Sequence, residues 1–161
     1  MKKRKMQIMI GFLLIVLVVG GALFAKINKK RIPITYEQFQ KYTEKNSIEF
    51  QDNREITISA KIGDGCAANI EENVQIEFLE APSEAVAIDY FNRYYQHMQQ
   101  FKDDKTAEKI VNLKHYAECI ITTDIMYIHI VRIDNTVMDA RVPKEKKNVV
   151  INVMKDLGYV D

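Results

Sequence analysis

Histidine side chains can bind metal ions, and the three histidines of this chain lie far apart in the sequence: His97, His115 and His129. None belongs to an HExxH or HxH motif and no CxxC pair accompanies them, so the ligand spacing of common zinc sites is missing. His129 falls on an expected central strand, where we interpret it as a hydrogen-bonded core residue, and His97 falls at the surface or boundary of a helix. We therefore expect no metal ligands and no cofactor.

Two pairs of adjacent carboxylates, Glu71-Glu72 and Asp103-Asp104, fall in expected turns. A glycosidase needs two carboxyl groups held across a cleft, and neighbouring turn acids are better explained as solvated charges. The chain contains no G-x-S-x-G elbow, and Gly63-Asp64-Gly65 is a turn signal rather than a phosphate-binding loop. We expect no catalytic residues and a protein that is not an enzyme.

Only two cysteines occur, Cys66 and Cys119, and two interpretations of them stay open. Outside the cytoplasm they could form a disulfide, whose large loop would stabilise the fold by roughly 4 kcal/mol in the chain-entropy model. Alternatively, both are buried thiols that behave as small apolar side chains.

The segment 84–102 carries aromatic residues at helical spacing. Such a stripe usually packs into the core. If its tyrosines are exposed together, they form the best candidate contact patch. These tyrosines are Tyr90, Tyr94 and Tyr95.

Capping and periodicity predict three helices in the part of the chain after residue 33. The first begins after Thr35, which forms a capping box with Gln38, and ends at Asn46 in a left-handed conformation. The second spans about 84–102 with Ser83 as N-cap, and the third begins at Pro143 and ends at Gly158. No clear element is indicated for 106–114.

Alternating apolar residues predict the strands, and the strand over 126–133 is apolar on both faces, which is typical of a central strand covered on both sides. The order α-βββ-α-βββ-α predicts an α+β fold with a mostly antiparallel sheet. The segments predicted as strands are 48–50, 56–62, 74–80, 116–122, 126–133 and 136–142, and 66–70 is a further candidate strand.

The N-terminus carries an almost unbroken apolar run, 6–25, between two basic clusters. Twenty residues of helix reach about 30 Å, the thickness of the hydrocarbon core of a bilayer. The run is longer than most signal-peptide cores, so we favour an uncleaved single-pass anchor over a cleaved signal peptide. We expect residues 1–5 inside the cell, 26–33 as a linker, and 34–161 as an extracytoplasmic domain at the cell membrane.

Charge is divided unevenly along the chain. Of the 23 Lys and Arg residues, eight lie in 1–31, which contains no acid. The rest of the chain is therefore acidic, which argues against binding to nucleic acid, since that needs clustered basic residues.

Several segments resemble a group of uncharacterised small proteins of Gram-positive anaerobic bacteria that are anchored in the cell envelope. The segments are ITYEQF, NVQIEFLEAPSEAVAIDYF, and HYAECIITTDIMYIHIVRIDNTVMDARVPKEKKNVVINVMKDLGY. The resemblance covers most of 32–161 and implies an envelope location. Many members of the group carry a lipid-anchor cysteine that this chain lacks, and the resemblance implies no catalytic residues.

Together these features predict a membrane-anchored extracytoplasmic domain that binds or scaffolds an envelope protein or a cell-wall component. One alternative is an enzyme with an unrecognised site. Another is a pilin-like assembly subunit cleaved before Phe12, although Val16 stands where such proteins carry a glutamate.

Overall fold

The computed structural model describes residues 31–161. The predicted cytoplasmic tail, the predicted anchor over 6–25, most of the linker and the pilin-type cleavage site lie outside the described residues. None of the helices within 31–161 has the length and apolar character needed to cross a bilayer.

The described residues form an α+β fold built on a seven-stranded sheet in which every neighbouring pair of strands is antiparallel. This confirms the predicted fold class. The sheet order is β1-β2-β3-β7-β6-β5-β4, so the N-terminal strands β1 to β3 join the C-terminal strands β4 to β7 where β3 pairs with β7. The elements are α2 (Tyr36–Lys45), β1 (Glu49–Asp52), α3 (Arg54–Ser59), β2 (Asp64–Glu71), β3 (Val74–Glu80), α4 (Glu84–Met98), β4 (Ala107–Asn112), β5 (Tyr116–Thr122), β6 (Met126–Ile133), β7 (Thr136–Pro143) and α5 (Lys147–Asp156), with short 3-10 turns at Gln99–Phe101 and Lys144–Lys146.

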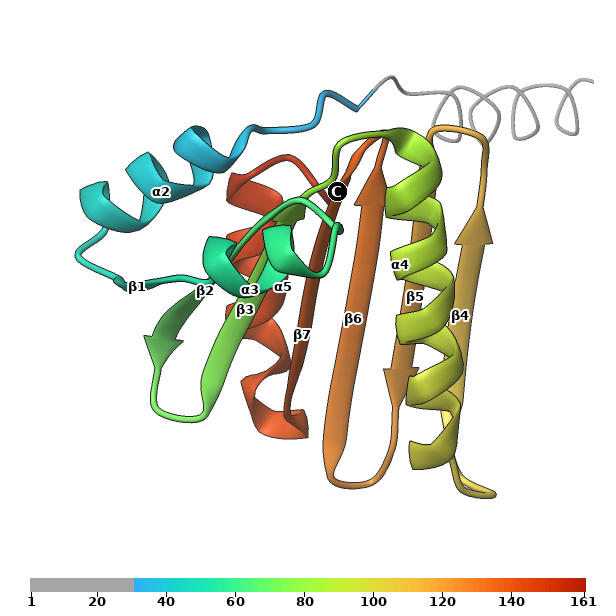
Figure 1. The fold of residues 1–161 in the computed structure, drawn as a ribbon. Coiled ribbons are helices and arrows are strands. Elements are labelled where there is room, and N and C mark those ends of the chain that lie inside the picture. The colour runs from blue at the N-terminus through green and yellow to red at the C-terminus, as the bar shows by residue number, and fades with distance from the viewer. Residues whose placement is uncertain (1–30) are drawn as a thin grey trace, which may run out of the picture. The chain divides into compact units, whose positions relative to one another are not determined.

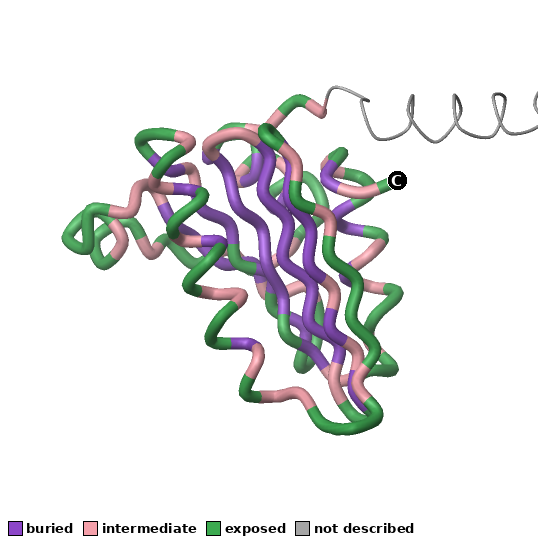
Figure 2. The backbone as a smooth tube through the Cα atoms, turned by 90° about the vertical axis from the view of Figure 1, so that its right-hand side faces the viewer, coloured by how far each residue is buried: buried purple, intermediate pink, exposed green. Residues whose placement is uncertain are grey.

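Helices cover both faces of the sheet (Figure 1). On one face α2 packs over β1, β2 and β3 and α5 packs over β3 and β7. On the other face α4 packs over β6 and β7, and α3 lies against β2. Strand β6 supplies both cores, since Tyr127 and Val131 join the α2/α5 side and Ile128 and Ile130 join the α4 side. The prediction of a central strand with two buried faces is confirmed, and Figure 2 shows the buried strands between the two helical layers.

The predicted helix starts are confirmed by their hydrogen bonds. Thr35 accepts from the backbone N–H of Gln38, whose side chain returns a bond to Thr35, and the Ser83 hydroxyl accepts from Val86. Gly158 has the left-handed φ of 78° expected of a helix stop. At the end of α2, however, the left-handed residue is Ser47 rather than Asn46, which has φ −98°.

The prediction of a half-buried strand over 56–62 is wrong, because this segment contains helix α3. Both edges of β2 are already paired, with β1 and with β3, so no position is left beside it for another strand. The chain instead crosses from β1 to β2 as a short helix, with Ile56 and Ile58 72% and 57% exposed. The alternating apolar residues of 56–62 therefore do not mark a buried face.

Residues 106–114, for which the sequence indicates no element, contain the edge strand β4. It pairs with β5 along its whole length, yet nearly all of its residues are exposed. An edge strand with few buried side chains leaves little periodic signal in the sequence.

Candidate functional site

The three tyrosines of the proposed contact patch are half-buried rather than exposed together. Tyr90, Tyr94 and Tyr95 pack against the core between α4 and the sheet, and the rings of Tyr90 and Tyr94 stack with centroids 6.4 Å apart. They do not form an exposed patch. Tyr90 and Tyr94 instead border hollows beneath α4.

The disulfide between Cys66 and Cys119 is not formed, because both residues are buried free thiols. Cys66 lies on β2 and faces α2 and α5, whereas Cys119 lies on β5 and faces α4. Four strand spacings separate β2 from β5, or about 19 Å. A disulfide needs Cα atoms roughly 4.4–6.8 Å apart, so this sheet cannot accommodate one.

A third pair of acids, which sequence reasoning missed, lies under α4. Glu77 on β3 and Asp139 on β7 are direct partners across the two strands and therefore point to the same face of the sheet. Asp139 is only 3% exposed, while Glu77 is exposed at the edge of the hollow. Two carboxyl groups so placed cannot both carry a charge without mutual repulsion.

The surroundings of these acids favour their neutral forms. Burial raises the pKa of Asp139 well above its usual value, the nearby charge of Glu77 raises it further, and a hydrogen bond from Tyr94 opposes the rise. Desolvation also raises the pKa of Glu77, against the effect of Arg141. A protonated Asp139 can donate a hydrogen bond as well as accept one.

A cavity of about 250 Å³ opens beside these acids. Its walls combine carboxyl, amide, imidazole, phenol and guanidinium groups, which come from α4, β3 and β7. We call it the carboxyl cavity, and its lining residues are Gln75, Glu77, Tyr94, His97, Met98, Asp139, Ala140 and Arg141. A smaller hollow of about 40 Å³ shares Glu77 and Asp139 and reaches Tyr90.

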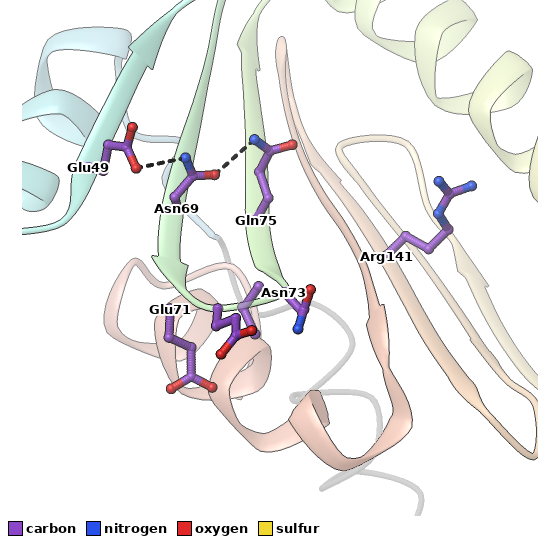
Figure 3. A pocket seen from close by; sticks show the side chains of 8 residues that line it. Glu49, Asn69, Glu71, Asn73, Gln75 and Arg141 are labelled. Carbon is purple, nitrogen blue, oxygen red and sulfur yellow. Dashed lines mark hydrogen bonds between the residues drawn. The ribbon is translucent and has the colours of Figure 1, made fainter.

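A wider, open pocket of about 600 Å³ adjoins the carboxyl cavity and shares Gln75 and Arg141 with it (Figure 3). We call this pocket the polar trough. It lies over the ends of β1, β2 and β3, and its other lining residues are Glu49, Asn69, Glu71, Glu72, Asn73 and Val74.

Hydrogen bonds between side chains order the floor of the polar trough. As Figure 3 shows, Asn69 donates to Glu49 at 3.1 Å and accepts from Gln75 at 2.9 Å. The three residues come from β1, β2 and β3 and form a ladder across the strands. Each amide keeps further donors or acceptors for a ligand.

Arg141 is held where the two hollows meet. Its guanidinium lies 5.1 Å from the ring centroid of Phe101, in a cation–π contact that restrains the side chain. It is the cationic group in the lining of both the cavity and the trough. The site therefore combines acceptors, a buried acid with a raised pKa and a cation restrained by an aromatic ring.

The opposite face holds a buried polar network that serves the core. The Tyr127 hydroxyl donates to His129 Nδ1 at 2.9 Å, and His129 Nε2–H donates to Glu118 at 3.1 Å. Lys109 donates to the second Glu118 oxygen at 2.7 Å. Burial raises the pKa of Glu118, but the hydrogen bonds from His129 and Lys109 outweigh it and hold that pKa at about 2. The interpretation of His129 as a hydrogen-bonded core residue is confirmed.

Comparison with known proteins adds no relative. No family model matches the chain, and neither the curated proteins nor the solved structures give a match. The resemblance to envelope-anchored proteins of Gram-positive anaerobes stays a prediction.

Proposed function

We propose that this protein is a single-pass membrane protein whose extracytoplasmic domain binds a cell-wall glycan. The apolar run over 6–25, flanked by basic clusters, supports the anchor. The acidic charge of the remaining chain and its folded domain of ordinary size support a head that works in water beside the membrane.

The observation that carries the binding role is the continuity of the polar trough with the carboxyl cavity. The two hollows share Gln75 and Arg141, and Asp139 lies buried in the cavity wall. A buried carboxyl group opposes folding unless partners compensate for its lost hydration. The position of Asp139 beside a cavity of ligand-group size favours a binding role for this end of the sheet.

The chemistry of the lining favours a neutral, hydroxyl-rich and amide-rich polymer. Carboxylates and amides accept from sugar hydroxyls, neutral Asp139 and Arg141 donate to carbonyl oxygens, and the ring of Tyr94 offers an apolar wall. An elongated ligand would follow the trough and place a terminal group in the cavity. The net acidity of the lining disfavours polyanions.

Cosedimentation of the detergent-solubilised full-length chain with purified cell walls tests this proposal. Arg141→Ala is expected to reduce the bound fraction several-fold, because it removes the cationic donor that lines both hollows. The matched control is Arg93→Ala, on the solvent side of α4 and outside both hollows, which should bind like the parent. Equal binding of all three proteins, or binding of none, would refute the proposal.

The location is tested separately by adding protease to intact cells. An extracytoplasmic domain should be digested, whereas a protected domain would overturn the proposed orientation. This result does not depend on whether a glycan binds.

A second candidate function, hydrolysis of the same kind of glycan, is favoured by the pair of carboxyl groups. Glu77 and Asp139 lie side by side on adjacent strands, and burial raises the pKa of Asp139 well above its usual value, as the acid of such a pair requires, while the exposed Glu77 would supply the carboxylate. Release of soluble fragments from cell walls, abolished by Asp139→Asn, would favour the enzyme over the binding module. Binding without release would favour the module.

A further inference from the structure

Three potential metal ligands converge at the opposite end of α4 from the carboxyl cavity. Glu84 is the first residue of α4, His115 lies in the β4–β5 turn, and Asp134 lies in the β6–β7 turn. His115 Nδ1 is 3.2 Å from Glu84 Oε1 and 2.9 Å from Asp134 Oδ1. One ligand atom from each residue lies within 4.8 Å of the others.

Backbone hydrogen bonds fix the turns that carry these side chains. The N–H of Asp134 donates to the carbonyl of His115 at 3.0 Å, which joins the two hairpin turns directly. The N–H of Ala81 donates to the carbonyl of Asn135 at 2.8 Å, and the Asn135 side chain donates back to Ala81, which joins the start of α4 to the same turn.

A buried arginine, Arg132, reinforces this arrangement. It is 2% exposed, and its guanidinium donates to the backbone carbonyls of Leu113, Lys114 and Asp134. It also reaches Glu84 Oε1 at 3.3 Å, which orients that carboxylate. Its charge reduces the attraction for a cation, but its donors hold the two turns and the Glu84 side chain in place. Little reorganisation would be needed to bind an ion.

The spacing fits the coordination sphere of a small divalent ion. Metal–ligand bonds of roughly 2.0–2.2 Å place adjacent ligands about 3.0 Å apart in an octahedron and about 3.4 Å apart in a tetrahedron. The two measured distances, 3.2 and 2.9 Å, lie near this range. An imidazole with two carboxylates is a donor set that suits zinc and its first-row neighbours better than calcium.

We propose that Glu84, His115 and Asp134 bind a divalent first-row transition metal ion of the Zn²⁺ type, with water in the remaining positions. The His115 side chain is 57% exposed, so an ion can enter from solvent and keep open positions. The motif escapes a sequence search because its ligands come from a helix start and two turns that are distant in the sequence.

Calorimetric titration of the full-length chain with Zn²⁺, after removal of metals by a chelator, tests this proposal. The parent should bind one ion tightly at this site, and its Tm should rise with Zn²⁺ concentration, since a ligand of the folded state stabilises it. His115→Ala, Glu84→Gln and Asp134→Asn should each weaken binding about tenfold or more, the loss expected for a disturbed metal site.

The design keeps the fold intact in the variants. Asp134 has φ 46°, a left-handed conformation that asparagine tolerates well, so Asp134→Asn removes charge without straining the turn. The control is Asp124→Asn, which removes an exposed acid from a different hairpin and should bind Zn²⁺ like the parent. Binding that all three site variants retain, or no binding by the parent, would overturn the proposal.

Discussion

The two faces of the sheet bury polar groups in different ways. On the α2/α5 side, Glu118, His129 and Tyr127 form a closed chain in which each polar group has a protein partner. On the α4 side, Asp139 is equally buried but borders a cavity and faces a second acid, Glu77. The first arrangement stabilises the core, whereas the second keeps hydrogen-bonding capacity for something outside the protein.

Within one sheet, this contrast separates buried polar groups that stabilise the fold from a buried polar group that stays available to a ligand. Burial alone does not distinguish the two, since His129 and Asp139 are 1% and 3% exposed. The difference lies in the partners and in the space beside the group. The predictions below test that difference, beginning with the largest effect.

Removing His129, the central residue of the Glu118–His129–Tyr127 chain, should unfold much of the protein population. His129→Ala leaves the Tyr127 hydroxyl and the Glu118 carboxylate buried with one partner fewer, and it opens a cavity. We expect the free energy of unfolding to fall by about 3–5 kcal/mol, the range for truncating a large buried side chain and leaving its hydrogen-bond partners short of a partner. Denaturant unfolding followed by circular dichroism measures this; a loss below 1 kcal/mol would show that the network contributes little.

The two thiols, one on each face of the sheet, should both react slowly. Burial raises the pKa of Cys66 and of Cys119 from 9.0 to about 12, so the thiolate fraction of each should be about a thousandfold lower than in a free cysteine. Labelling with a thiol reagent should be slow in the native protein and should reach both residues after unfolding. A mass lower by two hydrogens before reduction would reveal the disulfide that this sheet excludes.

The buried acid of the α4 side should oppose stability at neutral pH. Because its pKa is raised in the folded state, stability is full below the ordinary value of about 4 and falls as pH rises toward the folded-state pKa. Asp139→Asn should stabilise the protein above pH 7 by on the order of 1 kcal/mol, and should flatten this decline. Thermal unfolding of both proteins from pH 4 to 9 measures the effect.

A steeper decline in the variant than in the parent would contradict this account. It would mean that Asp139 is charged in the folded state and paired with a cation. The matched comparison is Glu118, whose pKa is lowered from 4.5 to about 2: its contribution to stability is full above pH 4.5 and is lost as pH falls from there toward 2.

Local signals were enough to predict most elements of this fold. The caps at Thr35 and Ser83 and the dense apolar pattern of β5–β7 specify helices and strands without help from distant residues. Tertiary context decided the exceptions. Helix α3 replaces a predicted strand because β2 has no free edge, and β4 exists because β5 offers one.

The candidate site was hidden because its parts are distant in the chain. Glu77 and Asp139 become neighbours only through the pairing of β3 with β7, which no local pattern indicates. One signal was present: Asp139 interrupts the apolar run of a strand that is buried on both faces. A charged residue at such a position has no place in a simple core and could have been singled out.

The C-terminus of the chain is tied to the place where the described residues begin. Arg31 donates to the carboxylate of Asp161 at 2.9 Å and its guanidinium stacks 4.0 Å from the ring centroid of Tyr116. A reporter or affinity tag fused after Asp161 would therefore emerge beside Arg31, at the same corner where the polypeptide enters the fold. A short peptide joining these two ends would suffice for circular permutation of the domain, with new termini in the exposed turn over 103–105.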